Sequence, residues 1–388
     1  MIYGNLIVHK NSVMKYRNDV MSIACDAIDF IIDTIPMTNI DPITTAHFIK
    51  ELNNTLYADI QILKKERIPS KEIYKLPYAQ VEGMMTGHPW FVINKGRIGF
   101  NATDHENYAP EMQNNINLQW LAINKNLMTF SCVSDLDYST ILNTEIDNNL
   151  LNEFNRIIID TSQNPDDFFI LPVHPWQWEN SIQQQFTKYI FDGDIIFLGQ
   201  STDKYLSMQS IRSFSNISHP EKHSIKLPLN ILNTAVYRGL PEDQTINAPI
   251  LTEWVKNIAK NDTFITKCNF ILLGETASAY CKHPYYSETN NAPYYFTEQL
   301  GAIWRESIHT KLHKDERAIT MATLTYVDQD GQSIICEMIS ESRLSIDNWL
   351  DTFFENTIPA LLHFLYKYGM VFSPHGENSI LIIKDNDT

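Results

Sequence analysis

Cysteine is scarce in this sequence, and its arrangement argues against two kinds of site. The chain has 388 residues but only five cysteines, which lie far apart and form no CxxC pair. A disulfide framework or a cysteine-ligated zinc site needs paired or regularly spaced cysteines. The pattern therefore favours a protein of the reducing cytoplasm.

Long apolar runs and clusters of basic residues are missing too. No run approaches the ~20 residues that cross a bilayer, and MIYGNLIVHKNSVMKYR at the start lacks the apolar core of a signal peptide. Lys and Arg number 30 against 46 Asp and Glu, which gives a net charge of −16. We expect neither a membrane nor a nucleic acid as partner, whereas a small anion in a local basic pocket remains compatible.

Several catalytic motifs are absent as well. The sequence has no GxxxxGK[ST], no GxGxxG after a strand, no GxSxG and no HExxH. One pair, His309 and His313, has the i,i+4 spacing of metal ligands, with Asp315 and Glu316 nearby. We favour a solvated, charged helix end over a metal site, because no third ligand is evident.

The first part of the sequence predicts helices. A hydrophobic content of 44% is typical of a folded protein, and the length predicts two or three domains. Apolar residues recur at helical spacing over 13–33, and a second helical run extends from Asp41-Pro42 to about Lys65.

From about residue 86 the pattern changes to short β-rich segments between turns. The expected strands, mostly antiparallel, are WFVI, FFILPV, DIIFLG, KYLSMQSI, SIKLPLNIL, TMATLTYV and SIICEMI. Helices are expected over 250–262 and from Ser345 to Gly369, the latter kinked at Pro359 and capped by Gly369. We therefore predict an α+β fold with a helical N-terminal part, a large, mainly antiparallel β-rich middle and the start of a further helical part.

Charged groups lie inside apolar surroundings at several places. In GHPWFVINKGRIGF, His88, Lys95 and Arg97 alternate with bulky apolar residues, as on a strand with Lys95 and Arg97 on one face. An ordinary half-exposed strand is the alternative. His174 in LPVHPWQWEN is either a core residue beside two tryptophans or a ligand-binding residue.

A second set of polar residues lies between 207 and 240. Its members are hydroxyl-bearing and basic residues on adjacent predicted strands or just beyond them: Ser210, Arg212, Ser213, Lys226, Thr234 and Arg238. Cations and hydroxyl donors along neighbouring strands suit a polyphosphate or a carboxylate. A scattered surface set is the alternative.

Two further segments carry candidate site residues. In LGAIWRESIH, Arg305 and Glu306 follow an apolar run and form either an internal ion pair or a substrate clamp. In FSPHGENSILII, His375 and Asn378 can face one ligand, while Glu377 and Asn378 are suitable Mg²⁺ ligands. A polar turn with Gly at positive φ is the alternative.

Taken together, these segments resemble the IucA/IucC family of NRPS-independent siderophore synthetases. The resemblance covers about residue 80 to 388 and rests on EGMMTGHPWFVINKGRIGF, YAPE, LPVHPWQWEN, SIRS, KLPLNILNTAVYRGL, LGAIWRES and YGMVFSPHGENS. The sequences of these motifs are most similar to those of the branch that makes hydroxamate siderophores of the desferrioxamine, alcaligin and bisucaberin kind. Citrate-using members more often have a second His-Pro where Phe91-Val92 stand here.

The resemblance implies a hand-like architecture and a reaction. The thumb would span 1–85, the β-rich fingers with the ATP and acyl sites 86–343, and the beginning of the palm 344–388. ATP and Mg²⁺ would activate a carboxylic acid, here a succinylated N-hydroxy-diamine, as its acyl-adenylate, and an amine or hydroxylamine would then form the amide or hydroxamate. The alternatives are a citrate-activating enzyme and an inactive nucleotide-binding fragment.

The resemblance also implies roles for individual residues. Expected phosphate ligands are Ser210, Arg212, Ser213 and Lys226. Residues expected at the nucleotide and metal are His375, Asn378 and Glu377. Those expected at the acyl substrate are His88, Lys95, Arg97, Thr234, Arg238 and Arg305. Family members continue well past the HGEN motif, so we expect a chain cut short at its C-terminus, and homodimers are common among them.

Overall fold

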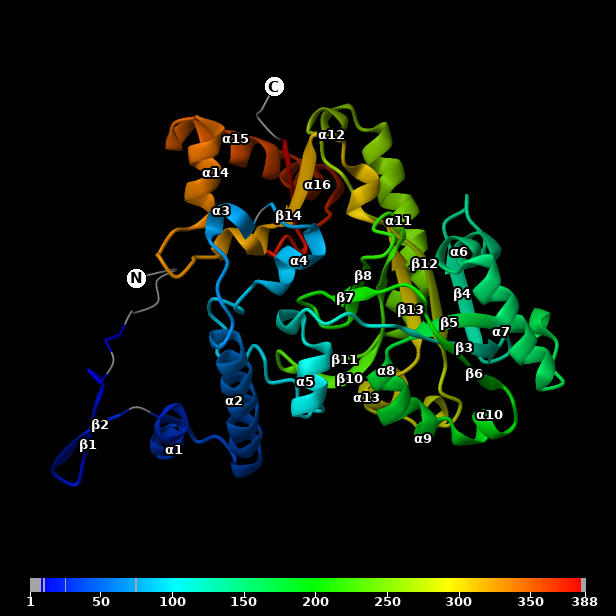
Figure 1. Cartoon of the computed structure of the whole chain (residues 1–388), viewed down its shortest axis with the longest axis horizontal. Helices are drawn as coiled ribbons and strands as arrows, with labels where there is room; N and C mark the ends of the chain where they lie inside the picture. The colour runs from blue at the N-terminus through cyan, green and yellow to red at the C-terminus, as the bar shows by residue number, and fades with distance from the viewer. Residues whose placement is uncertain (1–7, 10, 25, 74, 385–388) are drawn as a thin grey trace. The chain divides into compact units, whose positions relative to one another are not determined.

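The computed structural model describes residues 8–9, 11–24, 26–73 and 75–384, and the predicted α+β class is confirmed (Figure 1). Two compact units make up the chain. The first unit comprises Met1–Glu66, Thr86–Asn101 and Ile231–Tyr237, and the second comprises Arg67–Met85, Ala102–Asn230 and Arg238–Thr388. The division into thumb, fingers and palm stays a prediction.

The first unit begins with a hairpin where the sequence predicts a helix. Strands β1 (Met14–Arg17) and β2 (Val20–Ile23) pair antiparallel, and Asn18 and Asp19 between them have φ of 49° and 60°. Asn and Asp tolerate this left-handed conformation, which a two-residue hairpin turn requires. The predicted helix over 13–33 is therefore wrong in its first half.

Two helices follow, and aspartates cap both. Asp26 accepts hydrogen bonds at the start of α1 (Ala27–Thr38), and Asp41 does so at the start of α2 (Pro42–Leu63). Pro42 fits the first turn of α2 because its missing N–H would be unpaired there anyway. The predicted second helical run is confirmed.

The segment 86–101 does not form the predicted strand. Residues 92–95 make a turn, and in the described residues of this segment the β-type pairing is a single bridge between Ile98 and Leu232. Leu232 belongs to β10 (Leu229–Asn233), which pairs with β11 (Val236–Arg238). The alternation of apolar and polar residues in WFVINKGRI therefore does not reflect a strand.

The second unit contains a six-stranded antiparallel sheet in the order β4-β12-β13-β9-β8-β7. Its strands are β4 (Met128–Cys132), β12 (Glu275–Cys281), β13 (Gly301–Arg305), β9 (Ser224–Lys226), β8 (Ser213–Asn216) and β7 (Tyr205–Ser207). Helix α11 (Glu242–Asn261) packs against β12 and β4 (Figure 1). The chain returns to this sheet from distant parts of the sequence.

A three-stranded sheet completes the core of this unit. Its order is β5-β3-β6, with β3 (Gln119–Asn124) between β5 (Phe168–Val173) and β6 (Ile195–Gln200). Side chains alternate along β3: Leu121 and Ile123 join the core cluster of the large sheet, whereas Trp120 packs with α7 (Asn148–Asp160). A strand buried on both faces reads as a continuous apolar run.

The C-terminal region of the second unit is helical around a small sheet. Strand β14 (Glu316–Thr320) pairs with β15 (Ile380–Lys384). Helices α15 (Ile346–Thr357) and α16 (Pro359–Tyr368) confirm the predicted break at Pro359, and Gly369 caps α16 with φ 65°.

Two strands predicted in this region are wrong. Residues 321–325 form a 3₁₀ turn, and SIICEMI lies in α14 (Ile334–Ser342). Ser333 caps α14, and Ile334 and Met338 are buried at i,i+4 spacing. A short apolar run of this kind fits either a strand or a helix by pattern alone.

Shorter elements connect these parts. The helices are α3 (Ser70–Ile73), α4 (Tyr78–Gly83), α5 (Ala102–Tyr108), α6 (Tyr138–Glu145), α8 (Pro175–Gln177), α9 (Gln183–Gln185), α10 (Thr187–Phe191), α12 (Thr263–Lys267) and α13 (Tyr294–Thr297). The 3₁₀ or π segments are Pro110–Met112, Pro165–Asp167, Trp178–Ile182, Tyr286–Glu288 and Ile308–Lys311. Throughout the described residues, no helix has the length and apolarity to cross a bilayer.

Asp262 joins α16 to the rest of the second unit. Its Oδ2 accepts hydrogen bonds from His363 Nε2 at 2.9 Å, Lys367 Nζ at 2.7 Å and the Tyr368 hydroxyl at 2.7 Å. Its Oδ1 caps α12. These hydrogen bonds, that of Lys367 first, hold the pKa of Asp262 well below its usual range.

We expect Asp262→Asn to lower the melting temperature at neutral pH, because the ion pair with Lys367 is lost. The contribution of a carboxylate with a depressed pKa is present above its unfolded-state pKa, near 4, and disappears as pH falls. The melting temperatures of the two proteins should therefore converge in acid. Asp192→Asn, which breaks the exposed pair with Lys188, is the control and should change little. Equal effects of the two substitutions would contradict this role.

Candidate functional site

The site in the second unit is built where strands of the large sheet begin and end. Ser213 begins β8 and stands opposite Lys226, the last residue of β9. Arg305 ends β13, stands opposite Ser224 of β9, and also stands opposite Glu275, the first residue of β12. The antiparallel register therefore gathers side chains from distant parts of the sequence.

Glu275 is shared by two of the basic residues. Its Oε1 lies 2.9 Å from Arg305 Nη2 and 3.6 Å from Lys226 Nζ. Burial lowers the pKa of Lys226 to about 8; Glu275 opposes this shift, and the charges of Arg212 and Arg305 add to it. Burial raises the pKa of Glu275, but these two cations outweigh that effect and lower it.

Arg212 and Arg238 extend the positive cluster. Arg212 donates a hydrogen bond to the Gly239 carbonyl, and burial followed by the charge of Arg238 lowers its pKa to about 10. Burial also lowers the pKa of Arg238, against the opposing charge of Glu377. Arg238 Nε is buried and has no hydrogen-bond partner among the described residues. A buried donor without an acceptor is costly unless a ligand supplies one.

Ser210 and Arg212 lie in the turn before β8 rather than on the strand, which corrects the prediction. Ser210 Oγ accepts the Ser213 N–H at 3.2 Å. Ile211 between them is buried with φ 63°. For a β-branched residue this conformation is strained, and such strain is often stored at functional sites.

The HGEN residues form an exposed turn before β15, which is the alternative that the sequence left open, but Gly376 does not have the positive φ expected for it. Asn378 Nδ2 lies 2.8 Å from His375 Nε2, so the two predicted partners contact each other. Gly376 is required by close approach, not by positive φ: a Cβ there would lie 2.9 Å from Ala322 Cα. Glu377 acts electrostatically on Arg238, which connects the turn to the cluster.

The predicted acyl-side residues other than Arg238 and Arg305 belong to the first unit. His88 Nδ1 accepts the N–H groups of Trp90 and Phe91 at 3.2 and 3.1 Å. Buried Lys95 donates to Asp59 at 2.9 Å and also to Thr86 and Asn94, so its ammonium holds the local turn together.

The other two residues of this group have unusual backbone conformations. Arg97 is buried with φ 38°. Thr234 and Ala235 form the two-residue tip of the β10–β11 hairpin with φ of 49° and 63°. Such a turn favours Asn or Gly, so Thr-Ala is strained there. Roles of these residues at a substrate stay predictions.

The other histidines that the sequence singles out are His174, His309 and His313. His174 Nδ1 caps α8 by accepting the Trp176 N–H at 3.0 Å, and burial lowers its pKa to about 3, so it is a neutral buried residue. His309 and His313 belong to no group of three metal-ligating side chains in the part of the chain that the structure describes. The Nε2 of His174 is buried without a hydrogen-bond partner among the described residues, so the core and ligand-binding interpretations of His174 both stay predictions.

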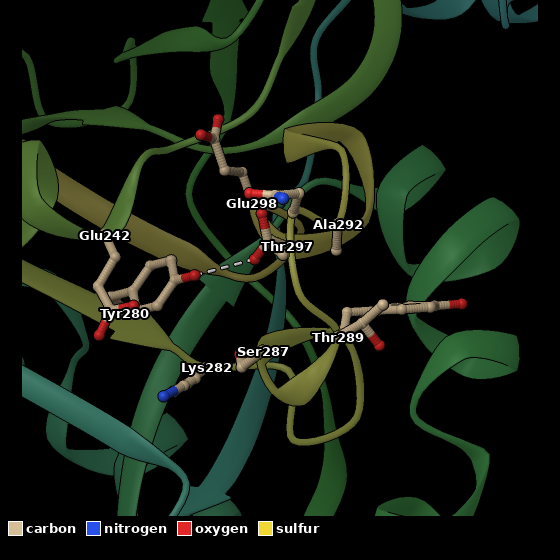
Figure 2. Close-up of a pocket in the computed structure, with 10 residues that line it drawn as sticks. Glu242, Tyr280, Lys282, Ser287, Thr289, Ala292, Thr297 and Glu298 are labelled. Carbon is tan, nitrogen blue, oxygen red and sulfur yellow. Dashed lines mark hydrogen bonds between the residues drawn. The ribbon is translucent and has the colours of Figure 1, made fainter.

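A polar pocket of about 320 Å³ adjoins the cluster through Glu298 (Figure 2). The Tyr280 hydroxyl points to the Thr297 carbonyl and donates to it at 2.9 Å. Burial raises the pKa of Glu298, and the charge of Arg212 opposes this. No predicted site residue lines the pocket.

Sequence reasoning missed the acidic members of the site. Glu275 and Glu298 lie far in sequence from the cations they act on, and nothing in GETASAY points to Lys226. Glu82 lies in the motif EGMMTGHP, whose sequence does not indicate the contact with Gln209. The position of Glu275 depends on the strand order, whereas those of Glu82 and Glu298 depend on how α4 and the end of α13 pack.

Comparison with known proteins identifies the family. A profile of the IucA / IucC family matches residues 77–326, well over half of the 388 residues. A second profile, described as ferric iron reductase FhuF-like transporter, matches the short stretch 347–388. Because it covers so little, the second match assigns no family.

Two similar proteins are a siderophore biosynthesis protein and a synthase by name. The Rhizobium meliloti rhizobactin siderophore biosynthesis protein RhbF is 35% identical over 99% of this chain and 64% of its own length. Putrebactin synthase of a Shewanella species is 34% identical over 92% of this chain and 57% of its own length. The chain therefore spans less than two thirds of these relatives.

A solved structure has the same fold. The aerobactin synthetase IucC of Klebsiella pneumoniae superposes with a TM-score of 0.83 at 31% identity, covering 94% of this chain and 64% of that one. The predicted family is thus confirmed by both sequence and structure, whereas the hydroxamate branch stays a prediction. The chain belongs to the IucA / IucC family.

Proposed function

We propose that the chain contains the ATP site of a siderophore synthetase, which activates a carboxylic acid as its acyl-adenylate and joins it to an amine or hydroxylamine. The observation that supports this most is the positive cluster of Arg212, Lys226, Arg238 and Arg305 in the second unit. Neighbouring cations disfavour one another's charge, and a bound polyanion would relieve this repulsion.

The proposed phosphate ligands are those predicted from the sequence, and Arg305 is reassigned from the acyl side to the phosphate side. Ser210, Arg212, Ser213 and Lys226 would bind phosphate oxygens through hydroxyls and cations. Arg305 shares Glu275 with Lys226, which favours a phosphate-side role over the acyl role implied by the resemblance. The orphan Nε of Arg238 would donate to the α-phosphate or the acyl carboxylate.

The proposed metal site is small. Mg²⁺ binds one or two carboxylates and otherwise keeps water and phosphate oxygens. Exposed Glu377 supplies one carboxylate, and the Asn378 side chain one carbonyl oxygen, which is a fitting donor set. His375, held by Asn378, would face the nucleotide. In the first unit, His88, Lys95, Arg97 and Thr234 remain the candidates for the acyl substrate.

The chemistry follows from the weakness of a carboxylate as electrophile. Its oxygen would attack the α-phosphorus of ATP, the bond to the β-phosphate would break, and pyrophosphate would leave. An amine or hydroxylamine nitrogen would then attack the acyl carbon, expel AMP and lose a proton. The cations would stabilise the charge that develops on the phosphate, and holding both substrates would supply much of the rate.

A succinylated N-hydroxy-diamine is the acid we favour. The similarity of the sequence GHPWFVINKGRIGF to the hydroxamate branch supports it. A citrate-derived acid is the competitor, because a relative from Bacillus anthracis at 31% identity is named citryl-spermidine/3,4-dihydroxybenzoyl-citryl-spermidine:spermidine ligase. Nucleotide binding without adenylation is the third possibility. The cytoplasm and a homodimer stay predictions.

ATP–pyrophosphate exchange on the full 388-residue chain tests the proposal. With Mg²⁺ and N-hydroxy-N-succinyl-cadaverine we expect exchange above the no-acid control, because adenylation is reversible while pyrophosphate is present. Exchange with citrate alone would move the chain to the citrate-using branch. Silence with both acids, in a chain shown to be folded, would contradict adenylation by this chain.

Lys226 gives a test with a pH signature. Replacing one charge-stabilising contact typically lowers the rate about a hundredfold, so Lys226→Met should do so in the exchange assay. Because burial holds the pKa of Lys226 at about 8, its charge is lost as pH rises through that value. The kcat/KM for ATP should fall there, and Lys226→Arg should move the fall to higher pH. An unchanged profile in Lys226→Arg would exclude this lysine, and Lys188→Met, at an exposed site, is the control.

A further inference from the structure

Glu82 is a buried carboxylate that holds the turn before β8. It lies in α4 and is 4% exposed. Its Oε2 accepts the backbone N–H of Gln209 at 2.9 Å, and the side-chain Nε2 of Gln209 donates to the Glu82 carbonyl at 2.7 Å. Two reciprocal hydrogen bonds thus tie the first residue of the turn to α4.

The turn needs such an anchor because its backbone is strained. It is closed by the Met208 N–H, which donates to the Ser213 carbonyl at 2.9 Å, and its centre is Ile211 in the left-handed conformation. Strained residues persist only where surrounding contacts over-determine them. Ser210, Arg212 and Ser213 lie on this turn, so the contact at Gln209 fixes the proposed phosphate ligands.

The charge of Glu82 depends on its surroundings. Burial raises its pKa to about 7; Glu377, before β15, adds to this shift. The Gln209 N–H, the Tyr78 hydroxyl of the same helix and the charge of Arg305 oppose it. At neutral pH the carboxyl is therefore divided between its charged and neutral forms. A second negative charge arriving nearby favours the neutral form.

We propose that Glu82 is a positioning residue that fixes the Gln209–Ser213 turn for phosphate binding and takes up a proton when an anion fills the site. This inference rests on the proposed function, because the anion is the polyphosphate of ATP. The side chain acts through Gln209 and touches no substrate. The neutral form keeps the oxygen that accepts the Gln209 N–H, so protonation removes repulsion without releasing the turn.

The test is to measure ATP binding to the full chain by isothermal titration calorimetry. Repeating the titration in buffers of different ionisation enthalpy gives the number of protons taken up. The wild-type affinity should fall by up to about tenfold between pH 6 and pH 8 through Glu82, because a group with a pKa near 7 loses its proton over this range. ATP binding at pH 7.5 should be accompanied by proton uptake. Lys226 also contributes to the pH dependence of the affinity and to the proton uptake. A comparison with a Glu82 variant therefore separates the contribution of Glu82.

Glu82→Gln mimics the protonated side chain and is the informative variant. It should bind ATP at least as tightly as wild type at pH 8, with a smaller pH dependence and less proton uptake. Glu82→Ala removes the anchor and should bind more weakly at every pH. Glu145→Gln is the matched control, because Glu145 is also buried in the second unit but pairs with His223 at 2.8 Å.

Three outcomes would overturn the inference. The first is a Glu82→Gln variant that binds ATP with the same affinity, pH dependence and proton uptake as the wild type. This result would leave the proposed function intact. The second is a Glu82→Gln chain that does not fold, since the neutral side chain must hold the turn. No ATP binding by folded wild-type chain would overturn both this inference and the proposed function.

Discussion

The repulsion among basic side chains at the strand ends of the large sheet is the constraint on which the site depends. Lys226 and Arg305 end β9 and β13, and Glu275 bridges them. Burial, together with the charges of neighbouring cations, lowers the pKa values of Arg212 and Lys226, and Arg238 has a buried Nε without a hydrogen-bond partner among the described residues. A fold holds such groups together at a cost in stability, which a polyanionic ligand would offset.

The sheet makes this arrangement possible because its order differs from the order of the sequence. Strands β12 and β13 insert between β4 and β9, which brings Glu275 and Arg305 beside Lys226. Buried side chains of β12, β13, β9 and β8 share one core cluster with Leu121 and Ile123 of β3. Packing thus determines which charges meet, and the strained turn at Ile211 adds the remaining ligands.

Local signals in the sequence predicted much of the fold, and their failures have physical reasons. The caps at Asp41 and Gly369 and the break at Pro359 depend on neighbouring residues alone, so they were readable. The hairpin around Asn18-Asp19 and the helix in SIICEMI were not predicted. A few apolar residues fit both the helical and the strand periodicity, so the pattern does not distinguish them. The family motifs identified the cations, whereas Glu275 and Glu82 required strand register and burial.

A crystal structure of the chain with a non-hydrolysable ATP analogue and Mg²⁺ tests the central claim most directly. The account predicts phosphate oxygens within hydrogen-bond distance of Lys226 Nζ and of the guanidinium groups of Arg212 and Arg238, with the Lys226–Glu275 distance lengthened from 3.6 Å. Phosphates bound elsewhere, with these cations still facing Glu275 and one another, would contradict it.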